Sequence, residues 1–177
     1  LGLMYGMGIA KLAASLDISP DQAKALKKKY NDNVHFLNNI IVRATRYTEQ
    51  NGYINTLLGR KCRFDLWENK DFHDKRMMSH ENAKKTWAWN EMKRAGTYRA
   101  LNRLIQGSAA DQTKKAMVDL WNTHRVVPMI QIHDELNISI ANETQVTEIK
   151  EIMESAVELH VPVKCEAKIG TNWGEIK

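Results

Sequence analysis

The amino-acid sequence predicts an α+β protein in which a small antiparallel sheet packs on helices. Two observations predict this class: apolar residues recur at helical spacing through the first two thirds of the chain, and the last third reads as strand, strand, helix, strand. Strands joined by a tight turn pair antiparallel, and a helix that follows them can cover one face of their sheet. We expect a helical segment over residues 1–52 and a portion that carries the sheet over residues 53–177.

Three helices are predicted in the first segment. The first occupies the second half of residues 1–16, and the second opens at Ser19-Pro20-Asp21-Gln22, which supplies an N-cap, a proline at the first helical position and a glutamine at the third. The third runs from about Val34 to Gln50, and Asn51-Gly52 ends it. Its apolar stripe consists of Val34, Leu37, Ile41, Ala44 and Thr48.

The middle of the chain begins with a hairpin in GYINTLLGRKCRF that turns near Leu58-Gly59. Asp65 to Ser79 is polar and charged, and it is predicted as a loop. A helix follows over about Asn82 to Leu104, and a second helix follows Gly107 over Ser108 to His124.

The last third begins with a hairpin around residues 133–135. Asn142 then caps a long amphipathic helix, Glu143 to His160, which Pro162 ends. Val163 to Ile169 alternates apolar and charged residues, so it is predicted as a strand with one solvent-exposed face.

The composition is that of a packed protein without a membrane-spanning segment. With 177 residues, 43% of them hydrophobic, the chain can bury a core, and no apolar run approaches the roughly 20 residues of a membrane span. Cys62 and Cys165 are far apart and outside any CxxC pair, which favours a reducing, cytoplasmic compartment over a zinc site or a disulfide framework. The net charge of +5 suits a polyanionic partner. The first residues read as the inside of an element, so we expect a piece of a longer polypeptide.

The stretch QIHDELNISI sets two carboxylates and a histidine between two apolar-alternating arms. One continuous strand would place Asp134 in an apolar face, where an unpaired carboxylate is heavily penalised, so we predict a turn. A three-residue loop, His133-Asp134-Glu135, would pair Ile132 with Leu136, and a two-residue loop is the alternative. Because the loop lacks glycine, we expect backbone strain at Asp134 or a neighbour. From these residues alone, a merely polar hairpin tip is an equally good interpretation.

Two further stretches are candidate binding sites. LNRLIQGSAAD joins a helix that carries Arg94, Arg99 and Arg103 to the next helix through Gln106-Gly107-Ser108, and its side chains are of the types that hydrogen-bond phosphates, sugars and base edges. The alternative is a solvated basic helix followed by a tight helix contact. In LGLMYGMG, glycines around Tyr5 expose an aromatic ring for stacking, unless that ring is an ordinary packed residue.

Together these stretches resemble the C-terminal part of family A DNA polymerases, including phage enzymes. The order LxxxYGM, GR, NxxxQGSAAD, an apolar strand ending in HDE, a second apolar strand and a closing GTNWGE extends the resemblance over nearly the whole chain. It implies template-directed transfer of a nucleotide from a dNTP to a primer 3′ end. It also implies that residues 1–52 belong to the end of the fingers and residues 53–177 to the palm.

The resemblance implies roles for the HDE residues. Asp134 matches an aspartate that binds two catalytic Mg2+ ions, Glu135 matches the acid beside it, and His133 matches a residue near the primer terminus. Phosphoryl transfer requires mainly positioning and charge stabilisation from the protein, which carboxylates holding two metal ions supply.

The resemblance also implies binding residues. Tyr5 and Gly6 match the nucleotide-binding end of the fingers helix. The candidates for contact with primer–template DNA are Asn102, Gln106, Arg99 and Arg103. Of these, the two amides match the family's minor-groove contacts, and the arginines are their neighbours.

Two groups that the family uses are expected upstream of this sequence: a second metal-binding aspartate and the basic residues that hold the triphosphate. The half-site of Asp134 and Glu135 is therefore predicted to bind Mg2+ weakly and to need the upstream portion of the polymerase for synthesis. One alternative is a catalytically inactive module that grips primer–template DNA. Another is a relative of single-subunit RNA polymerases, which Glu135 disfavours because serine is usual there.

Overall fold

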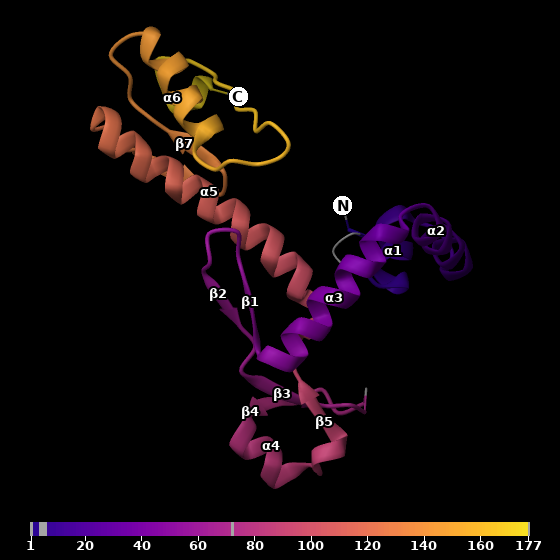
Figure 1. The fold of residues 1–177 in the computed structure, drawn as a ribbon. Coiled ribbons are helices and arrows are strands. Elements are labelled where there is room, and N and C mark those ends of the chain that lie inside the picture. Colours follow the sequence, from indigo (N-terminus) through magenta and orange to yellow (C-terminus); the bar gives the residue numbers. More distant parts are fainter. Residues whose placement is uncertain (1, 4–6, 72, 177) are drawn as a thin grey trace. The chain divides into compact units, whose positions relative to one another are not determined.

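The structure is a computed structural model that describes residues 2–3, 7–71 and 73–176 (Figure 1). The chain divides into two compact units, Leu1–Gln106 and Gly107–Lys177, and each is described by itself. Helices and small antiparallel sheets build the described parts of the chain, so the predicted α+β class is confirmed. Among the described residues, no helix is long and apolar enough to cross a membrane.

Three helices open the first unit, as predicted. They are α1 (Ile9–Leu16), α2 (Pro20–Asn33) and α3 (His35–Asn51). The predicted capping box of α2 forms: the Gln22 N–H donates to the Ser19 hydroxyl at 3.2 Å, and the Ser19 N–H donates to the Gln22 side chain at 2.9 Å. Gly52 ends α3 in a left-handed conformation with φ +76°. Leu37, Ala44 and Thr48 of the predicted stripe are buried.

A β-hairpin packs against α3 around the main core of this unit. Its strands, β1 (Tyr53–Asn55) and β2 (Lys61–Arg63), pair antiparallel. The predicted hairpin is confirmed, and Gly59 adopts φ +86° in the connection. The core combines side chains of α3, the hairpin and the start of α5 (Ala100–His124): Leu37, Ala44, Ile54, Phe64, Ala100 and Leu101. This packing fixes the first turn of α5, which carries candidate DNA-binding residues.

Residues 66–94 form a small module with its own core, which we call the aromatic module. Its elements are β3 (Leu66–Asn69), β4 (Met77–Ser79), α4 (His80–Thr86), the 3-10 turn η1 (Trp89–Glu91) and β5 (Met92–Arg94). The strands form an antiparallel sheet in the order β4-β3-β5. Ala83, Trp87 and Met92 are its buried centre, and Trp67 and Met78 pack against them.

Two sequence predictions are wrong in this region. The loop predicted over Asp65 to Ser79 contains β3 and β4, and the helix predicted over Asn82 to Leu104 is interrupted by η1, β5 and the 3-10 turn η2 (Thr97–Arg99). Strands of three or four residues are too short to show a clear alternation of apolar and polar residues. Gly96, with φ +68°, redirects the chain before α5 begins.

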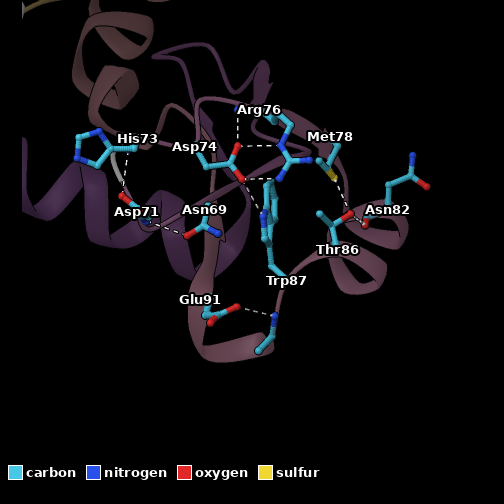
Figure 2. A network of polar contacts seen from close by, with 11 residues as sticks. Asn69, Asp71, His73, Asp74, Arg76, Met78, Asn82, Thr86, Trp87 and Glu91 are labelled. Carbon is cyan, nitrogen blue, oxygen red and sulfur yellow. Dashed lines mark hydrogen bonds and ion pairs between the residues drawn. The ribbon is translucent and has the colours of Figure 1, made fainter.

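A network of polar contacts holds the loop between β3 and β4 (Figure 2). The Arg76 guanidinium donates two hydrogen bonds to the Asp74 carboxylate, at 2.9 and 2.6 Å, and the Trp87 indole N–H donates a third at 3.0 Å. The side chains of Asn69 and Asp71 accept backbone N–H groups within the same loop, at 2.8 and 3.0 Å. The Arg76 donors, together with Trp87, hold the pKa of Asp74 well below the usual range of a carboxyl.

We expect the aromatic module to lose stability in acid because of Asp74. A carboxyl whose pKa is lower in the folded chain stabilises the fold above its unfolded pKa of about 3.9, and this contribution disappears as the pH falls through the folded pKa. Tryptophan fluorescence during urea unfolding, from about pH 6 down to about pH 2, measures the effect because Trp87 reports on this loop. Asp74→Asn should flatten the acid side of the profile, and an unaltered profile would contradict the assignment.

The second unit contains the C-terminal part of α5, a hairpin, a further α-helix and a 3-10 turn. The elements after α5 are β6 (Ile130–Ile132), β7 (Glu135–Asn137), α6 (Thr144–Ser155) and η3 (Trp173–Glu175). Ala116 and Leu120 of α5 are buried, and so are Ala156 and Val157 just after α6. These small and branched side chains allow close approach within the unit.

The end of the chain departs from prediction in two places. The helix predicted to reach His160 ends at Ser155, and Val163 to Ile169 forms no strand. The Cys165 N–H donates to the Glu154 carboxylate at 2.9 Å. A side chain therefore satisfies part of this backbone in place of a sheet partner.

Candidate functional site

The candidate catalytic carboxylates lie at the tip of the β6–β7 hairpin. Ile132 pairs directly with Glu135, so His133 and Asp134 alone form the turn, and the predicted three-residue loop is wrong. His133 has φ +52°, a left-handed conformation that residues other than glycine rarely adopt and that lets a two-residue turn close. The strain expected at Asp134 or a neighbour therefore lies at His133.

The register decides which side chains share a face of the hairpin. Directly opposed residues of an antiparallel pair point to the same side, so Ile130 and Ile132 share a face with Glu135 and Asn137, while Leu136 lies on the other. The expected continuous apolar face does not form. Ile130 and Ile132 are 40% and 38% exposed, which leaves an open face beside the Glu135 carboxylate.

Neighbouring amide side chains hold the tip of the hairpin. Gln131 Nε2 donates to the backbone oxygen of His133 at 3.1 Å, and Asn137 Nδ2 donates to Glu135 Oε1 at 3.1 Å. The three residues at positions 133–135 are exposed. Both carboxylates are therefore accessible to a ligand while the strands beneath them limit their movement.

The donor set at the tip fits Mg2+ in type but is incomplete. Asp134 and Glu135 offer the hard carboxylate oxygens that this ion prefers. Among the described residues, no group of three or more His, Cys, Asp or Glu side chains is arranged to hold a metal ion. Two ions roughly 4 Å apart require carboxylates from more than one segment. This tip by itself could therefore supply only one side of such a site.

The candidate DNA-binding amides lie at the start of α5. The predicted junction of two helices at Gln106-Gly107-Ser108 is wrong, because α5 runs through it without a break and tolerates the glycine at a cost of about 1 kcal/mol. Their four-residue spacing places Asn102 and Gln106 on one face of the helix. Asn102 Oδ1 is buried without a hydrogen-bond partner among the described residues, whereas Gln106 is exposed.

The two candidate arginines make contacts with neighbouring protein groups. Arg103 Nη1 donates to the backbone oxygen of Arg63 at 3.1 Å, and its guanidinium carbon lies 4.6 Å from the centre of the Phe64 ring. Arg99 Nε donates to the Tyr98 hydroxyl at 2.8 Å. Both arginines are exposed, and a guanidinium has five N–H donors, so each keeps donors for a phosphate.

Arg94, which the sequence groups with these arginines, has a structural role instead. It lies in β5 rather than on a helix, and its Nε and Nη1 donate to the backbone oxygens of Glu49 and Phe64, each at 3.2 Å. Its guanidinium carbon lies 5.0 Å from the centre of the Trp67 ring. Arg94 thereby joins the last turn of α3 to β3. Sequence reasoning missed this role because the partners are far apart along the chain.

Tyr5 and Gly6, the predicted nucleotide-binding residues, lie outside the described residues. The first unit has a cavity of about 600 Å³, lined by Gly2, Leu3, Met7, Leu12, Ser15, Leu16, Leu26, Tyr30, Asn33 and Val34. Binding a triphosphate requires cationic groups, and this lining offers none. The cavity is therefore not a nucleotide site by itself.

Comparison with known proteins relates the chain to one family over nearly all its length. The family described as DNA polymerase family A matches residues 1–175. A DNA-directed DNA polymerase of Pseudomonas phage M6 is 30% identical over 98% of this chain, and DNA polymerase I of Borreliella burgdorferi is 31% identical over 99% of it.

A solved structure shows the same likeness. The POL domain of Pol1 from M. smegmatis, in complex with DNA primer-template and dNTP, matches 92% of this chain with a TM-score of 0.68 and 27% sequence identity. The chain spans only part of each relative: 28% of the phage protein, 18% of the Borreliella protein and 27% of the solved chain. The likeness therefore concerns one portion of larger proteins.

Proposed function

This chain belongs to DNA polymerase family A, and we propose that it is the C-terminal part of a template-directed DNA polymerase that transfers a nucleotide from a dNTP to a primer 3′ end. The observation that carries the proposal is the hairpin tip, where an exposed Asp134 and Glu135 stand on paired strands within a chain that matches the family over residues 1–175. We assign residues 1–52 to the end of the fingers and residues 53–177 to the palm.

In this mechanism the hairpin positions carboxylates at the primer end. Asp134 would hold the Mg2+ ions, and Glu135, which accepts a hydrogen bond from Asn137, would be the second acid. Bound Mg2+ ions would stabilise charge on the attacking and leaving oxygens of an in-line transfer. Gln131 holds the backbone of His133, and we place the His133 side chain near the primer terminus. The strained turn keeps these groups at the tip of the hairpin.

Primer–template DNA is bound by the start of α5. Asn102 and Gln106 present amide groups on one helix face, and amides can donate to the acceptors of the minor groove. Arg99 and Arg103 supply phosphate contacts, and Tyr5 with Gly6 binds the incoming dNTP.

The upstream portion of the polymerase is the remaining partner. The described residues hold no three-ligand metal site, and the described residues that line the cavity of the first unit include no cation. We therefore propose that a carboxylate and the triphosphate-binding cations come from residues outside this sequence.

A primer-extension assay tests this proposal. We expect the 177-residue chain alone to give no Mg2+-dependent synthesis, and a polypeptide that joins it to the upstream portion of its polymerase to extend a primer. DNA binding without synthesis in the joined polypeptide would favour the alternative, a catalytically inactive module that grips primer–template DNA. Preferred incorporation of ribonucleotides would favour a relative of single-subunit RNA polymerases.

A further inference from the structure

The aromatic module is built separately from the core that supports α5. Its core of Ala83, Trp87 and Met92 is distinct from the cluster formed by α3, the β1–β2 hairpin and the start of α5. The chain enters and leaves the module side by side, where the Ala95 N–H donates to the Leu66 oxygen at 2.8 Å. The surface of such a module is free to serve a role other than supporting the fold.

Three aromatic rings lie in contact on this module: two are stacked, and the third is tilted against the first and edge-on to the second. The Trp67 and His80 rings lie 4.5 Å apart and only 25° from parallel, and the Trp89 ring lies 5.8 Å from Trp67 and 6.0 Å from His80. The outermost ring, Trp89, is 68% exposed. A large ring held in place by its neighbours but left open to solvent is a ready platform for a planar ligand.

A cation is fixed beside this platform. Lys70 Nζ donates to the backbone oxygen of Asn90, the residue after Trp89, at 2.6 Å. Among the described residues, no carboxylate forms an ion pair with Lys70. The Glu91 carboxylate of the same turn accepts the Ala88 N–H at 3.0 Å, so it is engaged by the backbone. An exposed indole next to an ammonium group is the combination that binds a stacked base and its phosphate.

The His80 ring is held by stacking and not by hydrogen bonds of its Nε2 atom. Its Nε2 atom is buried and has no hydrogen-bond partner among the described residues. A buried nitrogen without a partner costs free energy, so the position of the His80 ring is better explained by its stacking on Trp67 than by polar contacts within the module. The role of His80 is to hold Trp67 by stacking and to contact Trp89 edge-on.

We propose that Trp89 and Lys70 form a single-stranded DNA site in which one base stacks on the indole ring and the adjacent phosphate contacts the ammonium group. The proposal rests on the proposed function, because a template-directed polymerase handles single-stranded template. A nucleic acid is favoured over a protein partner because the residue after the exposed ring holds a cation through its backbone oxygen. The site uses no residue of the β6–β7 hairpin or of α5.

Fluorescence anisotropy of a dye-labelled thymidine oligomer, titrated with the 177-residue chain, tests the site. Trp89→Ala should weaken binding about tenfold, the effect of losing one stacked base, and Trp89→Phe should retain most of it. Trp173→Ala is the matched control, because Trp173 is also 55% exposed but lies in η3 of the other unit, and it should leave the affinity unchanged.

The salt dependence tests the phosphate contact. Lys70→Gln should lower the slope of log affinity against log salt by about 0.7, as expected for one phosphate of a single strand, and Trp89→Ala should leave that slope unchanged. Equal affinities of the Trp89→Ala variant and the unchanged chain, or failure of the unchanged chain to bind the oligomer, would overturn the inference. Neither result bears on synthesis by the joined polypeptide, so the proposed function is judged separately by primer extension.

Discussion

Asp134→Ala should abolish primer extension by the complete polymerase, with a loss of at least about 1,000-fold in rate. The expected size follows from the several kcal/mol of charge stabilisation that metal ions supply to such a transfer, since each 1.4 kcal/mol changes the rate about tenfold. The hairpin should survive the change, because Asp134 is exposed and makes none of the bonds that hold the tip. Single-turnover extension at saturating dNTP measures the loss.

The control for this variant is a carboxylate in the same unit with no assigned role. Glu158→Ala removes an exposed acid and should leave the rate within about twofold of the unchanged enzyme.

Glu135→Gln should be milder than Asp134→Ala, because its amide can still accept a hydrogen bond from Asn137 and only the charge is lost. Affinity for primer–template DNA should be the same for all three variants. A residual rate for Asp134→Ala above that of Glu135→Gln would show that the roles of the two acids are reversed.

Local sequence signals predict the helical part of the fold well. The capping box at Ser19 and the glycine that ends α3 act over four residues or fewer, so their outcome depends little on the rest of the chain. The β1–β2 hairpin is similar, because a short connection containing Gly59 brings its strands together. The position of Asp134 at a hairpin tip could also be predicted, from the cost of placing a carboxylate in an apolar face.

The remaining features depend on contacts between distant residues. The register of the β6–β7 hairpin depends on the left-handed backbone conformation of His133. The turn contains no glycine from which that conformation could be predicted. The aromatic module needs Trp67 and Trp87 in one core, although charged residues separate them in the sequence. Arg94 joins three segments that are far apart in the sequence. Its structural role becomes visible only in the folded chain, where its guanidinium donates to the backbone oxygens of Glu49 and Phe64.

The largest effect expected on stability comes from that last contact. Gly52→Ala should destabilise the chain by about 3 kcal/mol, from two causes. The residue has φ +76°, where a Cβ costs about 1–2 kcal/mol. The added Cβ would also lie 2.7 Å from Cζ and 2.8 Å from Nη1 of Arg94. The guanidinium must then move and give up hydrogen bonds to Glu49 and Phe64, each worth about 1 kcal/mol.

Gly59→Ala separates the two causes. Gly59 has a similar φ of +86°, but no atom lies within 4 Å of the position that its Cβ would take. It should therefore show the backbone cost alone, about 1–2 kcal/mol in urea unfolding. A double-mutant cycle of Gly52→Ala with Arg94→Ala completes the test: if the guanidinium is what the new Cβ displaces, Gly52→Ala should cost no more than Gly59→Ala once Arg94 is removed. Equal effects of Gly52→Ala in the presence and absence of Arg94 would instead place the whole cost in the left-handed backbone and show that the new Cβ does not displace the guanidinium.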